Sequence, residues 1–210
     1  MNSEDAKPAA RQRKARKRKF FIIRPSATSR GSGFELLNGD TLFRNGPPTF
    51  YWPPDGRRGF RDYPERPVFV ADPKRGHLHW DFDEYSVYWF VSERMKSVLQ
   101  AADPDAFAFL PCDVRSPGGA PQPTRWLCDV VRVLDALDED QSETTNRIAD
   151  DGSKYYGGIF NSKLVFREGL VGSAHVFRLT FYDTAFICDQ EFAMACKAAG
   201  LKGMSFGPTD

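Results

Sequence analysis

The chain has 210 residues, of which 41% are hydrophobic and 27% charged, and its formal net charge at pH 7 is +1. This composition is ordinary for a folded globular protein and excludes a collagen-like or mostly disordered chain. No apolar run approaches the roughly 18 residues that a membrane-spanning helix requires, so no membrane partner is expected. The length favours a single domain with at most an additional arm.

The charge is unevenly distributed along the chain. Of the 29 basic and 28 acidic residues, eight basic and only two acidic ones fall within residues 1–19, so the remainder is mildly acidic. We expect residues 1–18 to form a flexible basic arm and residues 19–210 to form the folded domain. The arm is either a nucleic-acid-binding segment, acting through counterion release, or a solubilising extension.

The cysteines and the N-terminus indicate the compartment. Cys112, Cys128, Cys188 and Cys196 form no C-x-x-C pair and are too sparse for a disulfide scaffold, which favours buried, reduced thiols. The apolar run at 20–23 is too short for a signal peptide. The expected location is therefore the cytoplasm.

The first strand is expected at 19–23 and another at 67–71, separated by a stretch rich in glycine, proline and arginine. Within that stretch, residues 49–64 (TFYWPPDGRRGFRDYP) combine aromatic residues with prolines and arginines. Such a segment is either an ordered loop whose aromatic rings pack on the sheet or an exposed surface with the composition of binding hot spots. In the second case the candidate contact residues are Trp52, Arg57, Arg58 and Arg61.

Residues 77–83 (HLHWDFD) alternate strictly between polar and apolar side chains. In an extended strand, Leu78, Trp80 and Phe82 would face the core. The opposite face would carry two imidazoles and two carboxylates, a combination that can hold a divalent metal; these residues are His77, His79, Asp81 and Asp83. Any solvent-facing strand can produce this spacing, so a plain polar face is the favoured interpretation and no cofactor is predicted. A metal-dependent enzyme remains a less favoured alternative.

Two helices are well marked. Ser92 is the expected N-cap of a helix over 93–102, and Asp189 that of a helix over 189–199, which Gly200 would terminate in the left-handed conformation. Strands are expected at 106–114 and 125–134, with an exposed loop at 115–124, and the remaining ones at 163–167, 174–181, 185–188 and near 204–206. This order favours an α+β fold: one domain with a mostly antiparallel sheet and two main helices packed on it.

An acidic segment follows the strand expected at 125–134. Residues 135–151 hold seven carboxylates and the single Arg147. The segment is either a solvated loop or a negative surface that attracts a basic partner. For the second reading the candidate contact residues are Asp135, Asp138, Glu139 and Asp140.

Positive evidence for catalysis is missing from the sequence. There is no phosphate-binding loop, no complete dinucleotide glycine fingerprint and no G-x-S-x-G nucleophile elbow. Paired carboxylates occur in the acidic segment, but spacing alone does not make a general acid. The composition is typical of a binding protein.

Several segments together resemble a known family. They are KFFII (19–23), RPVFVADP (66–73), FVSERMKSVL (90–99), FAFLPCDV (107–114), WLCDVVRVLDALDEDQS (126–142), KLVFREGLVGSAHVFRL (163–179) and ICDQEFAMACKAAGLKGMSFGP (187–208). In this order they resemble the myxobacterial-type immunity protein domain, immunity family eleven of bacterial polymorphic toxin systems. The resemblance covers about residues 19–210. It implies a cytoplasmic, non-enzymatic protein that neutralises a toxin encoded nearby by binding it, and it assigns no contact residues.

Overall fold

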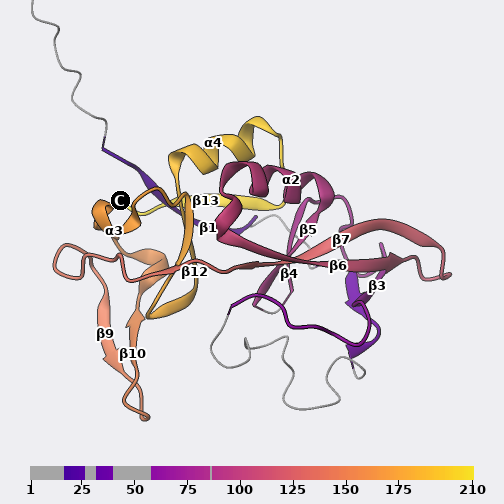
Figure 1. Ribbon diagram of the computed structural model, residues 1–210, viewed down its shortest axis with the longest axis horizontal. Coiled ribbons are helices and arrows are strands. Elements are labelled where there is room, and N and C mark those ends of the chain that lie inside the picture. The colour runs from indigo at the N-terminus through magenta and orange to yellow at the C-terminus, as the bar shows by residue number, and fades with distance from the viewer. Residues whose placement is uncertain (1–16, 27–31, 40–57, 86) are drawn as a thin grey trace, which may run out of the picture.

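The computed structural model describes residues 17–26, 32–39, 58–85 and 87–210 (Figure 1). These residues form two main mixed sheets, a separate two-stranded hairpin and three α-helices, two of them long, which confirms the α+β fold class. The short helix is α3 (Glu168–Val171), and these residues also include two 3-10 turns, η2 (Pro104–Ala106) and η3 (Ile159–Asn161), each of which lies between a helix and a strand.

The first main sheet has five strands in the order β13-β1-β12-β11-β8. Its strands are β13 (Met204–Pro208), β1 (Phe20–Pro25), β12 (Tyr182–Asp189), β11 (Val176–Leu179) and β8 (Val133–Leu134). All its pairs are antiparallel except β11 with β8. Residues from both ends of the chain therefore meet in one sheet, since β1 pairs with both β12 and β13.

The second main sheet has six strands in the order β2-β3-β6-β7-β5-β4. They are β2 (Phe34–Leu36), β3 (Val68–Ala71), β6 (Phe107–Arg115), β7 (Pro121–Val130), β5 (Tyr88–Ser92) and β4 (Phe82–Tyr85). Only β3 and β6 run parallel. The strand expected at 125–134 is confirmed up to Val130, whereas the loop expected at 115–124 is shorter, because β6 and β7 pair as far as Arg115 and Pro121.

Helices α2 (Glu93–Ala102) and α4 (Gln190–Ala198) lie side by side over one side of the sheets (Figure 1). Both predicted caps are confirmed: the Ser92 hydroxyl accepts from the Met95 amide at 3.1 Å, and the Asp189 carboxylate from the Phe192 amide at 3.0 Å. Gly200 ends α4 with a φ of +62°. The apolar faces of both helices enter a core cluster shared with the two sheets.

The strand predicted at 163–167 is wrong. Phe166 forms only an isolated bridge with Leu137. The neighbouring amides donate in different directions, from Leu164 to the Thr209 carbonyl and from Arg167 to the Ala136 carbonyl. Leu164 and Phe166 are nevertheless buried, so their hydrophobic burial, and not a strand ladder, produces the apolar alternation read from the sequence.

A buried ion pair connects the two main sheets. Arg178 on β11 is 1% exposed and donates to Asp129 on β7, which is fully buried, at 2.7 Å. The same guanidinium donates to the carbonyls of Val130 (2.8 Å), Val87 (3.1 Å) and Asp183. One side chain therefore joins β11 to β7, to the β4–β5 turn and to β12.

Removing one partner of this pair should leave an uncompensated buried charge. We expect Asp129→Ala to lower the free energy of unfolding by about 3–5 kcal/mol. The matched control is Asp135→Ala, which removes a carboxylate that lies 3.8 Å from the exposed Arg167 and should change stability by less than about 1 kcal/mol. Urea denaturation followed by circular dichroism measures both, and equal effects would contradict the assigned role of the pair.

Candidate partner-binding surface

The alternation predicted for residues 77–83 is wrong. Strand β4 begins only at Phe82, because the amides of Asp81 and Phe82 both donate to the Lys202 carbonyl and the chain turns there. Asp81 and Asp83 are buried, at 7% and 6% exposure, and do not share an outer polar face with the exposed His79. Trp80, expected in the core, is partly exposed and stacks on His77 with ring centroids 3.9 Å apart.

The two carboxylates have opposite environments. Asp81 accepts hydrogen bonds from Arg94 (2.5 Å), Ser92 (2.8 Å) and the Lys202 amide (2.9 Å). Burial alone would raise the pKa of Asp81, but these donors hold it below its ordinary value. Burial raises the pKa of Asp83 to about 7, since Arg125 stays 3.8 Å away and one carboxylate oxygen has no hydrogen-bond partner. Of the four candidate metal ligands, the structure brings His77 and Asp83 together, with the His77 Nε2 atom 3.5 Å from an Asp83 oxygen, while Asp81 belongs to a separate contact with Arg94.

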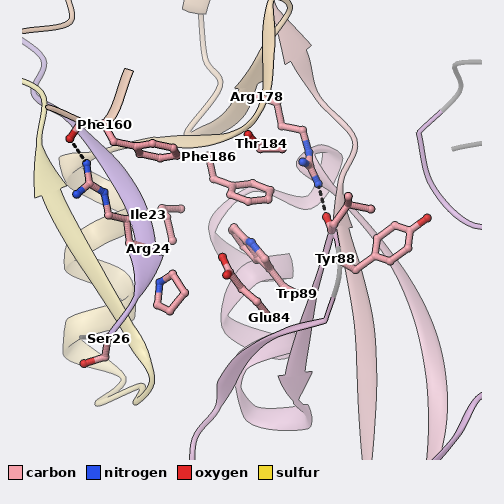
Figure 2. Close-up of a pocket in the computed structure, with 12 residues that line it drawn as sticks. Ile23, Arg24, Ser26, Glu84, Tyr88, Trp89, Phe160, Arg178, Thr184 and Phe186 are labelled. Atoms are coloured by element: carbon pink, nitrogen blue, oxygen red, sulfur yellow. Dashed lines mark hydrogen bonds between the residues drawn. The ribbon is translucent and has the colours of Figure 1, made fainter. Parts of the chain in front are cut away.

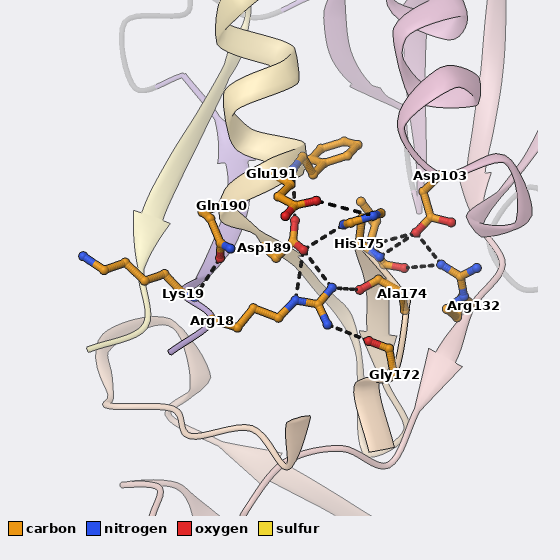
Figure 3. A network of polar contacts seen from close by, with 12 residues as sticks. Arg18, Lys19, Asp103, Arg132, Gly172, Ala174, His175, Asp189, Gln190 and Glu191 are labelled. Carbon is orange, nitrogen blue, oxygen red and sulfur yellow. Dashed lines mark hydrogen bonds and ion pairs between the residues drawn. The ribbon is translucent and has the colours of Figure 1, made fainter. Parts of the chain in front are cut away.

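A different group of potential metal ligands exists within the described residues, made of His175, Asp189 and Glu191 (Figure 3). Asp189 accepts from the His175 ring at 2.8 Å and from Arg18 at 2.7 Å. The Arg18 guanidinium already occupies the Asp189 carboxylate, and its positive charge would repel a metal cation from the same carboxylate. These contacts hold Asp189, the N-cap of α4, so the cluster acts as a structural network at the start of that helix.

Arg18 also bears on the predicted boundary of the basic arm. Besides Asp189, its guanidinium donates to the carbonyls of Gly172 (2.8 Å) and Ala174, so this residue is bound to the folded body (Figure 3). Residues 1–16 of the predicted arm lie outside the described residues.

The acidic segment contains both structural and exposed carboxylates. Glu139 accepts from Lys154 (2.5 Å), Tyr156 (2.7 Å) and Asn146 (2.8 Å), and these hydrogen bonds lower its pKa to about 2. The half-buried Asp138 accepts from the amide and side chain of Gln141. Asp135 is exposed beside Arg167, and Asp140 is exposed as well. Of these four acidic residues, Glu139 is the one held by three neighbouring side chains.

The segment continues into a hairpin that protrudes from the body (Figure 1). Strands β9 (Thr145–Ile148) and β10 (Lys154–Gly157) pair only with each other. The buried Tyr156 anchors the hairpin through an edge-to-face contact with Phe181 at 5.6 Å. Its outward residues include Ile148, 68% exposed, and Tyr155, 39% exposed, next to an acidic tip. We call this set the hairpin surface: Asp140, Glu143, Ile148, Asp150, Asp151 and Tyr155.

The candidate contact residues of the aromatic and arginine segment at 49–64 have different outcomes. Trp52 and Arg57 lie outside the described residues. Arg58, predicted as a contact residue, is internal. Its side chain is 9% exposed and donates to Asp183 at 2.5 Å, and its positive charge also lies near the buried Asp129 carboxylate. Arg61 is exposed and stays a candidate.

The rings of the same segment fit its core-packing interpretation where they are described. Phe60 packs on Tyr88 with centroids 4.9 Å apart, and Tyr63 joins the same apolar cluster.

The fold is that of an α+β protein, and the hairpin surface and Arg61 are its candidate contact features. A family model described as "Immunity protein family (Imm11)" matches residues 19–210, nearly the whole chain. The chain belongs to this family, which indicates a toxin-neutralising immunity role and implies a toxin partner. No curated protein matched the chain. Among the described residues, no helix is both long and apolar enough to cross a membrane.

Replacing Asp81 or Asp83 with asparagine should change the stability of the protein in opposite directions. Asp83 binds a proton more tightly in the folded than in the unfolded chain, so stability should fall as pH rises from about 4 to about 7. Asp83→Asn should flatten that decline and stabilise the protein at pH 8. Asp81→Asn should destabilise it there, because three donors lose a charged acceptor.

Thermal unfolding of both variants between pH 4 and pH 8 measures these effects. The same direction of change in both variants at pH 8 would contradict the assigned environments.

Proposed function

We propose that this protein is an immunity protein that binds a cognate bacterial toxin domain in the cytoplasm and neutralises it by covering its surface, without chemistry of its own. The family match over residues 19–210 is the observation that carries the proposal. The arrangement of carboxylates agrees with it, because the buried Asp81, Asp129 and Asp189 are each paired with an arginine of the same chain.

We further propose that the hairpin surface is the main contact with the toxin. Tight neutralisation needs a standard interface of roughly 1,600 Å² in total, and a hairpin that protrudes from the body can contribute surface to it from both of its faces. A hairpin paired with no other described strand can enter a cleft without disturbing the main sheets. Its acidic tip, with Asp150 and Asp151 fully outward, suits a toxin whose cleft is basic.

The apolar residues of the hairpin surface would contribute most of the binding free energy of this contact. Ile148 and Tyr155 are exposed large side chains, and burying such groups at the centre of an interface contributes most of the binding energy. The surrounding carboxylates would act mainly on the association rate and its salt dependence. Arg61 is a peripheral candidate, and the basic arm at residues 1–18 keeps its alternative prediction of nucleic-acid binding.

Protection of living cells tests the function. The toxin domain at the C-terminal end of the protein encoded by the neighbouring reading frame is expressed with and without this chain. We expect growth to be rescued and the two purified proteins to form a stable complex. Unchanged killing, with both proteins present in soluble form, would contradict the immunity assignment.

Charge reversal tests the hairpin surface. Asp140→Lys with Asp150→Lys should weaken toxin binding about 10- to 100-fold at low salt and flatten its dependence on ionic strength. Glu139 is left intact because its contacts with Lys154 and Tyr156 hold the hairpin in place. Surface plasmon resonance at several salt concentrations measures both rate constants.

The matched control changes the net charge equally at exposed carboxylates away from the hairpin, with Asp105→Lys and Glu65→Lys. These substitutions should alter binding by less than about threefold. If both double variants behave alike, the effect belongs to net charge and the hairpin is removed from the interface.

A further inference from the structure

The protruding hairpin has one free strand edge. Among the described strands, β9 and β10 pair only with each other, and β10 lies nearer the body than β9 (Figure 1). The amide of Tyr156 on β10 donates to the Phe181 carbonyl at 2.9 Å, so the outer edge of β10 meets the folded body. All four residues of β9 are exposed, and no described backbone group bonds to its outer edge.

The register of the hairpin identifies the groups on this free edge. The Ala149 amide donates to the Ser153 carbonyl at 2.9 Å, so these two residues form a hydrogen-bonded pair. Hydrogen-bonded and non-hydrogen-bonded pairs alternate along antiparallel strands. The amides and carbonyls of Asn146 and Ile148 therefore point outward from β9, as the amide of Tyr156 does from β10.

Two other sheet edges carry protection that β9 lacks. The edge strand β13 ends in Pro208, which has no amide to donate, and on the edge strand β4 the Phe82 amide is bonded to the Lys202 carbonyl at 3.1 Å. A charged side chain can also guard an edge. The Arg147 side chain does not, because it lies over Gly157 of β10, where an added methyl group would stand 3.1 Å from its Nε atom.

Contacts at the base hold this edge in position before any partner binds. Glu139 accepts from Asn146 of β9 at 2.8 Å and from Tyr156 of β10 at 2.7 Å. Just beyond β10, the Phe160 carbonyl of η3 accepts from the Arg24 guanidinium, which also covers the Phe160 ring at 5.0 Å (Figure 2). A strand that is already ordered loses little conformational entropy on binding, which favours the addition of a partner strand.

The charges at the two ends of β9 select the partner. Exposed carboxylates precede the strand at Asp140 and Glu143 and follow it at Asp150 and Asp151. A second copy of this chain, paired along β9 in either direction, would bring carboxylates against carboxylates, which is destabilising. An extended segment with lysine or arginine at both ends gives opposite-charge pairs instead.

We propose that the outer edge of β9 receives an extended basic segment of the toxin as an added strand, bonded through its backbone to Asn146 and Ile148. This inference rests on the proposed function and specifies how the hairpin surface makes its contact. The main-chain hydrogen bonds supply affinity, and the flanking carboxylates and the exposed Ile148 side chain supply specificity.

Amide hydrogen exchange tests the added strand. The ¹⁵N-labelled full chain is followed by NMR with and without the toxin domain encoded by the neighbouring reading frame. The amides of Asn146 and Ile148 should exchange at least about 100-fold more slowly in the complex. The Arg147 amide, which faces Tyr155 of β10, serves as the control and should already be protected in the free chain.

The outcomes separate this inference from the proposed function. A stable complex in which both outward amides stay unprotected overturns the added strand and leaves the immunity function standing. Protection that is present in the free chain and disappears on dilution assigns the edge to a second copy and overturns the toxin as its occupant. If no complex forms, both proposals fall.

A proline variant tests the backbone contact independently. Ile148→Pro removes an outward amide and keeps the bonds to β10, because an edge strand tolerates proline where its N–H faces solvent. The matched control, Ile148→Ala, shortens the side chain and keeps the amide. By surface plasmon resonance, Ile148→Pro should weaken toxin binding at least about tenfold more than Ile148→Ala. Equal weakening would reduce the contact to the side chain and overturn main-chain pairing.

Discussion

The ion pair between Arg178 and Asp129 is the constraint on which the rest of this structure depends. Two sheets that face each other need a fixed relative position, and apolar packing alone is compatible with several sliding arrangements. Arg178 restricts them, because its donors engage Asp129 and Val130 on β7, Asp183 on β12 and Val87 beside β5. A planar guanidinium can meet all these acceptors only when the two sheets have one mutual register.

The same pair determines which features remain outside. The second oxygen of Asp129 accepts from the Gly59 amide at 2.8 Å, which brings Arg58 inward to Asp183 and leaves Arg61 exposed. Arg178 donates to the carbonyls of Val87 and Asp183, and a pocket of about 620 Å³, lined by Ile23, Trp89 and Phe186 among others, lies between the sheets beside it.

Local signals in the sequence were sufficient for elements that are stabilised locally. The helices α2 and α4 could be predicted because Ser92 and Asp189 cap them by contacts within three residues, and Gly200 terminates α4 through its own backbone preference. Residues 77–83 and 163–167 were misread because distant carbonyls, those of Lys202, Thr209 and Ala136, take their amides away from a strand ladder. The pocket was missed since its walls come from residues 23–26, 84–89, 160 and 178–186, which no spacing rule connects.

The carboxylates show why a sequence count of charge does not locate a binding surface. Asp103, for example, accepts from Arg132 and from the amides of His175 and Val176, so its charge is neutralised inside the fold. Glu139 belongs to the acidic segment by sequence but supports the hairpin by its contacts. Its neighbour Asp140, one residue further, faces solvent. Electrostatic attraction to a basic partner must therefore come from the exposed carboxylates that internal arginines and lysines do not neutralise, and the hairpin whose turn carries Asp150 and Asp151 projects from the body (Figure 1).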